Sequence, residues 1–439
     1  MMFGEGLLGT LGDRHRKQRK LLNPIFSAAQ MRNMSPTFRD VVHKLEKCLE
    51  NQVKSGAQEI DMLSWMARTA LEIVGQSGLG HSFDSMTEDA VPHPYIRSIK
   101  DLMPLLFKLN IPAAYILPWA VNIGSPRSRR FVVNVVCLFW KNAREMRDRC
   151  DFMWKVSEEI YEKKKTALAE GDETVSMQIG KGKDILSVLM RENMKAADED
   201  KLDETELIGQ MSTLIFAAMD TTSNGMARML DLLSTHRDIQ NKLRREVTEA
   251  RKEAGRDLTY DELTALPYLD AVCRETLRLY PPVTQLSRVA RQATVLPLSR
   301  PITGIDGTII KEIHIPKNTT INVSISNANR NIEIWGPDAM EWKPERWLQP
   351  IPQKVVDSKM PGVYSHLMTF FGGNRSCIGF KFSQLEMKLV MSILLEKFEF
   401  LPTDKVTVWQ MAAVSSPTVK GDTAHPQLPM RVRLIEREV

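Results

Sequence analysis

The sequence of 439 residues lacks any segment that predicts a transmembrane helix or a signal peptide. A helix that crosses a bilayer needs about 20 consecutive apolar residues, and no such run occurs. The nearest candidates are Ile111–Ile123, which Pro112 and Pro118 interrupt, and Phe131–Trp140, which is too short. Neither segment predicts a membrane span.

Cysteine is scarce, and the net charge is small. The five cysteines are odd in number and scattered, without the spacing of a zinc site or a disulfide framework, which favours a reducing compartment and leaves one thiol free for chemistry. A formal charge of +5 is low for this length and argues against a nucleic-acid-binding protein.

Linkers and repeats are also absent, while the composition, 43% hydrophobic and 26% charged, is that of a globular protein. We therefore expect a single domain over residues 1–439. Apolar residues at three-to-four spacing predict a succession of helices over about 1–290. Short apolar segments separated by glycine and proline, mainly between 295 and 326, predict a small β portion within 291–439. The predicted fold class is mainly α with a small β portion.

Three finer expectations concern individual elements. The long helical pattern between Asp198 and Ala250 predicts two helices with a break near His236. A further amphipathic helix is expected after Cys377. The tail from Lys405 onward, with short apolar segments around Pro417 and Pro429, predicts a hairpin.

The segment Phe370-Phe371-Gly372-Gly373-Asn374-Arg375-Ser376-Cys377-Ile378-Gly379 places a thiol between a glycine-containing loop and a helix start. The positive end of a helix dipole and loop N–H groups stabilise a thiolate there. Gly373 and Gly379 allow the backbone to approach a flat cofactor, and Arg375 offers a cation for a carboxylate. Alternatively, Cys377 is one more buried structural cysteine.

This segment resembles F-x-x-G-x-R-x-C-x-G, the haem-binding loop of the cytochrome P-450 superfamily. The resemblance implies that Cys377 is the metal ligand, holding the iron of haem b, and that Phe370, Gly373, Arg375 and Gly379 belong to the cofactor site. It also implies the fold of that superfamily. Members of the eukaryotic microsomal type carry residues before the position of Leu11, so we expect a fold without the N-terminal anchor and part of the main β-sheet.

A second match is Glu275-Thr276-Leu277-Arg278, which places a carboxylate and a guanidinium on one helix face. Alone, this is a common surface ion pair that contributes little to stability. Together with Pro344-Glu345-Arg346-Trp347, it resembles the structural triad of the family, which implies that Glu275, Arg278 and Arg346 support the core on the haem side.

The third match is Ala217-Ala218-Met219-Asp220-Thr221-Thr222 within the long apolar helix, where an acid is costly to bury. A polar helix face with threonines bonding back to the preceding turn is the simpler interpretation. The resemblance to the oxygen-activation motif A-G-x-D-T-T instead implies that Asp220 supplies protons and that Thr221 holds iron-bound dioxygen and its water. Ala218 stands where the family often has glycine and narrows the oxygen groove beside the haem.

Near the start, the basic run between Arg14 and Lys20 is typical of a solvated helix face or a nuclear-localisation signal. The resemblance implies that His15 and Arg19 contact the haem propionates together with Arg288 and Arg375. The remaining basic residues then lie on the thiolate side, where a reductase that carries electrons from NADPH through a flavin docks.

The resemblance thus predicts a monooxygenase that inserts one atom of O2 into an apolar organic substrate. The residues expected to face the substrate pocket are Ala217, Val283, Thr284, Leu286, Ser416 and Pro417. The family lies on the endoplasmic reticulum membrane surface, which implies peripheral membrane contact near Ile111–Trp119. This sequence encodes no anchor and is expected to be cytoplasmic as it stands.

Two rival interpretations stay open at the level of sequence. One is a truncated, non-catalytic haem-binding remnant. The other is a haem-thiolate enzyme that rearranges or dehydrates its substrate without external electrons, which Asp220 and Thr221 disfavour.

Overall fold

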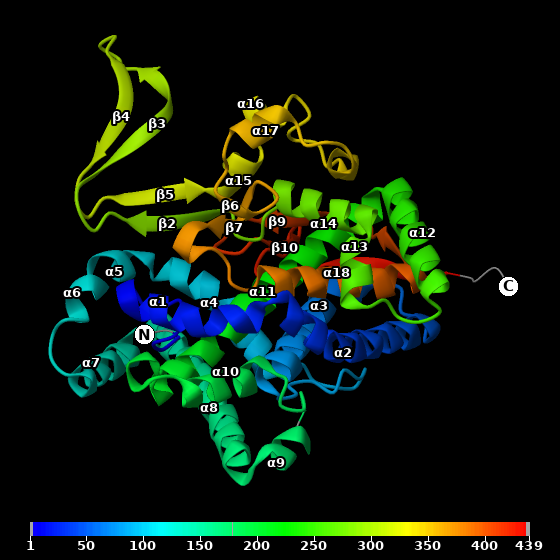
Figure 1. Cartoon of the computed structure of the whole chain (residues 1–439), viewed down its shortest axis with the longest axis horizontal. Coiled ribbons are helices and arrows are strands. Elements are labelled where there is room, and N and C mark those ends of the chain that lie inside the picture. The colour runs from blue at the N-terminus through cyan, green and yellow to red at the C-terminus, as the bar shows by residue number, and fades with distance from the viewer. Residues whose placement is uncertain (1–2, 178, 436–439) are drawn as a thin grey trace.

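The structure is a computed structural model that describes residues 3–177 and 179–435, and helices dominate it (Figure 1). The helices of the first half are α1 (Gly12–Leu22), α2 (Ala28–Lys54), α3 (Met62–Ile73), α4 (Pro94–Lys108), α5 (Asn110–Tyr115), α6 (Leu117–Ala120), α7 (Pro126–Phe139), α8 (Lys141–Glu170), α9 (Asp172–Met177) and α10 (Ile185–Lys195). Those that follow are α11 (Glu204–Thr235), α12 (Arg237–Ala254), α13 (Tyr260–Ala265), α14 (Pro267–Leu279), α15 (Ile325–Asn329), α16 (Ile332–Trp335), α17 (Gln353–Asp357) and α18 (Phe380–Lys397).

The strands pair antiparallel in small sheets. They are β1 (Ile60–Asp61), β2 (Gln285–Val289), β3 (Thr294–Thr303), β4 (Ile309–Ile315), β5 (Thr320–Ser324), β6 (Gly362–Tyr364), β7 (Leu367–Gly372), β8 (Phe398–Pro402), β9 (Thr407–Gln410), β10 (Ser416–Val419) and β11 (Pro429–Leu434). One sheet has the order β1-β11-β8, and the other pairs are β2 with β5, β3 with β4, β6 with β7, and β9 with β10. The β3–β4 hairpin projects from the body of the molecule (Figure 1).

The expected fold class, mainly α with a small β portion, is confirmed, and most strands lie after residue 290, although β1 and β2 precede it. The break near His236 is confirmed too, because α11 ends at Thr235 and α12 begins at Arg237. The predicted tail hairpin is correct only for Pro417, which pairs with Trp409. It is wrong for Pro429, because β11 pairs with β8 and β1 in a separate sheet.

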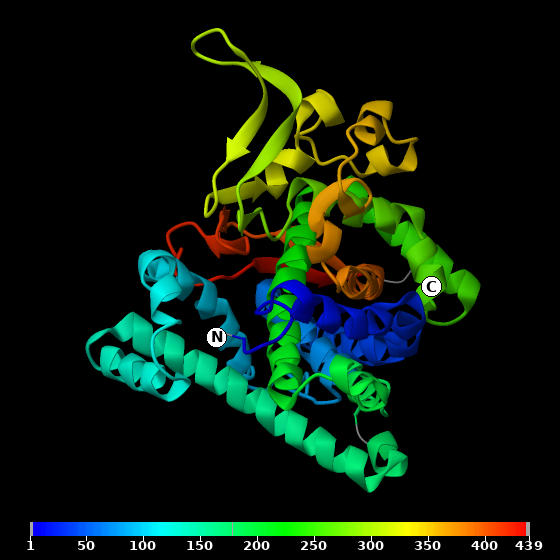
Figure 2. The ribbon, with the colours of Figure 1, turned by 60° about the vertical axis from the view of Figure 1, so that its left-hand side comes forward.

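Helix α11 runs through the centre of the molecule, and α8 crosses it (Figure 2). Its start is fixed by a capping box, in which Asp203 accepts from the Glu206 N–H and Glu206 accepts from the Asp203 N–H. Buried residues lie on nearly every face of this helix, as expected of a helix enclosed by others. It packs against α3, α8, α14 and α18. Because of this central position, its side chains can line a cavity inside the molecule.

Membrane crossing was not expected from the sequence. Within residues 3–177 and 179–435, no helix combines the length and the apolar character that a crossing requires.

Candidate active site

A cavity of about 210 Å³ lies at the centre, lined by α11 and by the loop that precedes α18. It brings together residues that are far apart in the sequence and that were predicted to form one site. The predicted residues in its wall are His15, Arg19, Ala217, Ala218, Thr221, Phe370, Arg375, Cys377 and Gly379. The rest of its wall is mainly apolar.

The loop that carries the thiol is a tight turn between β7 and α18. Phe371 and Gly373 have φ values of 57° and 66°, and the left-handed conformation at the second position explains a glycine there. The Cys377 N–H closes the turn by donating to the Phe370 carbonyl at 2.8 Å. Gly379 lines the cavity as predicted, whereas Gly373 supplies the turn.

The Cys377 side chain is open to the cavity while protein surrounds the loop. Burial raises the pKa of the Cys377 thiol, and the Gly379 backbone N–H and the Arg19 guanidinium oppose that rise. Residues 3–177 and 179–435 contain no cluster of three His, Cys, Asp or Glu side chains that could hold a metal ion.

Basic side chains gather at one end of the cavity. Arg19 donates to the Ser376 carbonyl at 2.8 Å and to its hydroxyl at 3.0 Å, and Arg375 donates to the Thr10 carbonyl at 3.0 Å. Arg288 does not line the cavity, but it stacks on the Phe371 ring at 4.7 Å. Burial lowers the pKa of Arg375, and the charges of Arg288 and Arg19 lower it further.

These cations lack an anionic partner in the part of the chain that the structure describes, since none of the three arginines forms an ion pair there. Burial, followed by the charges of Arg375 and Arg19, lowers the pKa of His15, which favours a neutral imidazole. Mutual repulsion of this kind is relieved by a bound anion. Haem suits the site, because it presents two carboxylates, a flat apolar ring and an iron that accepts a thiolate.

On α11, Thr221 lines the cavity and Asp220 does not. The Thr221 hydroxyl donates to the Ala217 carbonyl at 2.7 Å. The Asp220 carboxylate is buried and accepts from Lys100 Nζ at 3.2 Å and from Asn224 Nδ2 at 3.0 Å. Lys100 lies in α4, far away in the sequence, so no local pattern could have revealed it; Asn224 is one helical turn from Asp220 and could have been found by its spacing.

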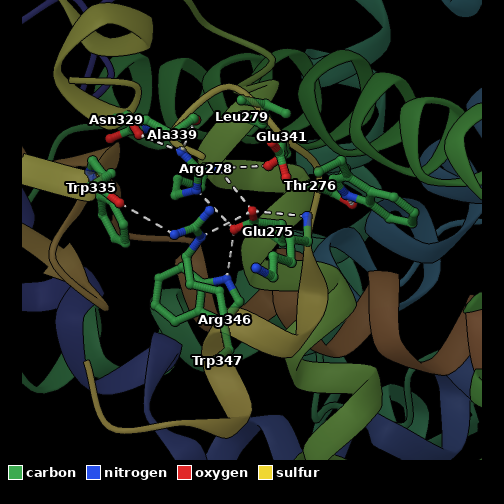
Figure 3. Close-up of polar contacts among 12 residues, drawn as sticks. Glu275, Thr276, Arg278, Leu279, Asn329, Trp335, Ala339, Glu341, Arg346 and Trp347 are labelled. Atoms are coloured by element: carbon green, nitrogen blue, oxygen red, sulfur yellow. Dashed lines mark hydrogen bonds and ion pairs between the residues drawn. The ribbon is translucent and has the colours of Figure 1, made fainter. Parts of the chain in front are cut away.

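The predicted triad is assembled in the structure as a buried network (Figure 3). Arg278 donates two hydrogen bonds of 2.8 Å to the Glu275 carboxylate, and both side chains are fully buried. Arg346 adds a 3.3 Å bond to the same carboxylate. Sequence reasoning missed Trp347, whose Nε1 donates to Glu275 at 2.9 Å.

The same network joins separate segments of the chain. Arg278 also donates to the carbonyls of Asn329, Ala339 and Glu341, so α14 is tied to the segment that follows α15 (Figure 3). The network lies outside the cavity wall, in keeping with the structural role predicted for it.

Comparison with known proteins decides the family, because a cytochrome P-450 family model matches residues 1–421. The chain belongs to the cytochrome P-450 family. The match begins at residue 1, earlier than the Leu11 expected from the motifs. Cytochrome P-450 monooxygenase 91 of Postia placenta is 51% identical, covering 98% of this chain and 79% of that protein.

Two further comparisons agree. Ganoderic acid synthetase of Ganoderma lucidum is 47% identical, covering 99% of this chain and 80% of that protein. The crystal structure of a cytochrome P-450 aligns with a TM-score of 0.71 at 22% identity over 99% of this chain and 82% of that chain, which supports the mainly α fold.

As a cytochrome P-450, the chain is a haem-thiolate monooxygenase that uses O2, an organic substrate and a redox partner. No observation favours the non-catalytic alternative. The cofactor implied by the family is haem.

The cytochrome P-450 cavity brings together only part of the predicted substrate pocket. Ala217 lines it, whereas the other predicted positions do not. Thr284 lines a separate cavity with Asn224 and Arg228, and its carbonyl accepts from the Ile325 and Ser326 N–H groups. The remaining residues are held in or beside short strands, namely Val283, Leu286, Ser416 and Pro417.

Proposed function

We propose that the central cavity is the active site of the monooxygenase and that Cys377 would hold the haem iron there. The supporting observation is that Cys377 and Thr221 face one apolar cavity from different elements, with basic residues at one end. His15, Arg19, Arg375 and the adjacent Arg288 would hold the propionates. Phe370, Gly373, Ala218 and Gly379 would complete the cofactor site.

When bound, haem supplies the electron and oxygen chemistry, and a thiolate ligand favours O–O cleavage. The side chains of this protein orient the reactants and control protons. The Thr221 hydroxyl lies at the cavity wall, where it can hold a water and pass a proton. Asp220, whose carboxylate points away from the cavity and pairs with Lys100, would supply that proton.

The lining of the cavity supports an apolar substrate. Leu7, Leu8, Val74, Ile185 and Leu214 contribute apolar side chains to its wall, and such sites bind mainly apolar molecules with a few placed polar contacts. We keep Val283, Thr284, Leu286, Ser416 and Pro417 as candidate substrate contacts that a closing movement would have to bring to the cavity.

The electron donor is proposed to be an NADPH-dependent flavoprotein that docks on the basic face beside α1. The side chains of Arg16 and Lys20 are 82% and 72% exposed, and with Asn374 they border a broad surface depression. Complementary charge accelerates such encounters and is screened by salt. Turnover at limiting reductase should therefore fall as ionic strength rises, and salt-independent turnover would count against this face.

The chain is also proposed to act as one domain, 1–439, at the endoplasmic reticulum membrane surface. One continuous core of buried residues includes side chains from α1 to β11, which supports the single domain. Exposed apolar residues on α5, α6 and α7 support the membrane contact, among them Tyr115, Trp119, Leu138 and Phe139.

Incorporation of isotopically labelled dioxygen tests the function. With haem, a reductase and NADPH, one labelled oxygen atom should enter the product. Product formation without external electrons would instead support a rearranging or dehydrating enzyme, and haem binding without any product would support the non-catalytic alternative.

A further inference from the structure

The first half of α11 presents two polar side chains to an otherwise apolar end of the cavity. Gln210 and Thr213 lie three residues apart, and therefore on one helix face. Both line the cavity, and both are buried, with 1% and 4% of their surfaces exposed. Their neighbours in the wall include Leu7, Leu8 and Leu214.

Gln210 is held in one orientation by the N-terminal segment. Its Oε1 accepts from the Leu7 N–H at 3.0 Å, which fixes which end of the amide faces Leu7. Its Nε2 has no hydrogen-bond partner within residues 3–177 and 179–435. The amide therefore offers a buried donor that its surroundings in the protein do not satisfy.

Three threonines of α11 line the cavity, namely Thr213, Thr221 and Thr222. The hydroxyl of Thr222, which lies next to Thr221, has no partner among the described residues. Thr221 bonds back to the Ala217 carbonyl, as threonines within helices commonly do. The Thr213 hydroxyl makes no such bond and has no partner among the described residues. A buried polar group left unpaired is destabilising, so Gln210 and Thr213, two such groups on one helix face, call for a ligand that pairs with them.

We infer that Gln210 and Thr213 bind an oxygen atom of the substrate, and that the substrate is therefore an apolar molecule bearing a ketone or hydroxyl oxygen. Both side chains are neutral donors, which favours a neutral acceptor over a carboxylate. This inference rests on the proposed active site and adds the class of its substrate.

The position of the pair also orients the substrate. Thr213 precedes Thr221 by eight residues, about 12 Å along the helix axis. The oxygen-bearing end of the substrate lies toward the start of α11, and the carbon that reacts lies toward Thr221.

Binding of matched ligand pairs to the haem-loaded enzyme tests the inference. The hydrocarbon and the ketone of three skeletons, linear dodecane, adamantane and androstane, are titrated while the Soret band is followed. The wild-type protein should bind at least one ketone about tenfold more tightly than its hydrocarbon, because the hydrocarbon leaves both donors unpaired. Thr213→Val and Gln210→Leu should each reduce that preference several-fold, and the double variant should abolish it.

The Thr213→Val change preserves side-chain shape, so it separates the loss of a hydroxyl from misfolding. Thr248→Val, the same change on an exposed face of α12, should leave the preference intact. Equal affinity for ketone and hydrocarbon in the wild type, or no binding of any ketone, overturns the inference. If the wild type has a normal haem spectrum and Thr213→Val loses its haem, the inference is also overturned, because these side chains would then serve the cofactor. An abnormal haem spectrum in the wild type would instead contradict the proposed function.

Discussion

At the scale of single residues, Asp220 and Thr221, which we propose supply protons, point in different directions from α11. Consecutive residues of a helix do not face each other, so Thr221 reaches the cavity while Asp220 reaches Lys100 and Asn224. Asp220, the acid that is costly to bury within an apolar helix, therefore has polar partners on the side of α11 that faces away from the cavity. The proposed proton supply would therefore start on the side of α11 that faces Lys100.

Substitution of the motif should separate proton supply from cofactor binding. Asp220→Asn should lower the rate of product formation by about a hundredfold, because an amide cannot act as an acid. Thr221→Ala should divert electrons from product to hydrogen peroxide. Haem content should not change in either variant, and both effects are measured as product and peroxide formed per NADPH consumed.

The control for these variants is Thr235→Ala, at the exposed end of the same helix, which should behave as the wild type. Unchanged product yields in both Asp220→Asn and Thr221→Ala would refute the assignment of proton supply.

Contacts between side chains could be predicted wherever residues close together in the sequence carry the pattern. The loop around Cys377, the Glu275–Arg278 spacing and the motif at Asp220 are local, and the structure brings their residues together as the patterns suggest. Lys100 and Trp347 could not be predicted, because their contacts join α4 to α11 and the 3-10 helix Pro344–Leu348 to α14. Such contacts depend on tertiary packing alone.

At the scale of elements, the buried network around Glu275 holds α14 against the segment that ends near Arg346. Glu275→Gln should lower the free energy of unfolding by about 3–5 kcal/mol, because it leaves the fully buried Arg278 charge without its counter-charge. Chemical denaturation measures this change.

Glu333→Gln is the matched control, since Glu333 pairs with Arg300 on the surface, where an ion pair contributes about 1 kcal/mol or less. A loss for Glu275→Gln no larger than that of the control would contradict the role of the network.

A second contact between elements, centred on His43, contributes a stabilisation that depends on pH. His43 of α2 bonds Glu46 at 2.8 Å and Asp257, beyond α12, at 2.9 Å, and Arg39, Arg251 and Lys397 pair with the same carboxylates. The hydrogen bond to Glu46, helped by that to Asp257, raises the pKa of His43. The stabilisation is therefore fully present below the unfolded value of about 6.5 and is lost as pH rises through the higher folded value.

His43→Gln should accordingly destabilise the protein most at about pH 6 and least at about pH 9. Unfolding midpoints of wild type and variant across that range provide the measurement. A difference that grows with rising pH would show that the imidazole does not carry this charge.

Helix boundaries were easier to predict than strand partners. The break between α11 and α12 follows from local composition. The partner of β11 does not, because β11 pairs with β8, and the two strands are separated in the sequence by more residues than a hairpin loop contains. Strand pairing over such distances is decided by which surfaces meet after the helices have packed. The sequence pattern at Pro429 indicated a strand and could not indicate its partner.

At the scale of the whole molecule, α5, α6 and α7 lie along one side (Figure 1). These helices carry large apolar residues that are exposed. Trp119 and Phe139 are 76% and 87% exposed, and Arg127 and Arg129 stand at the start of α7. Apolar surface beside basic residues is typical of proteins that bind anionic membranes peripherally.

Replacing Trp119 and Phe139 together by serine should weaken binding to phosphatidylserine-containing vesicles about tenfold, because less apolar surface enters the interface. Co-sedimentation measures the binding. Val356→Ser, on α17 away from this side, is the control, and equal loss in both proteins would show that this surface is not the one that meets the membrane.

The central claim is that the Cys377 thiolate binds the haem iron, and the difference spectrum of the reduced protein with carbon monoxide tests it most directly. The wild type should give the Soret band of a thiolate-ligated haem, and Cys377→Ser should lose it. Burial raises the pKa of Cys273 to about 12, so that thiol stays protonated, and Cys273→Ser should keep the band. A thiolate band that survives in Cys377→Ser, or that disappears in Cys273→Ser alone, would contradict the account.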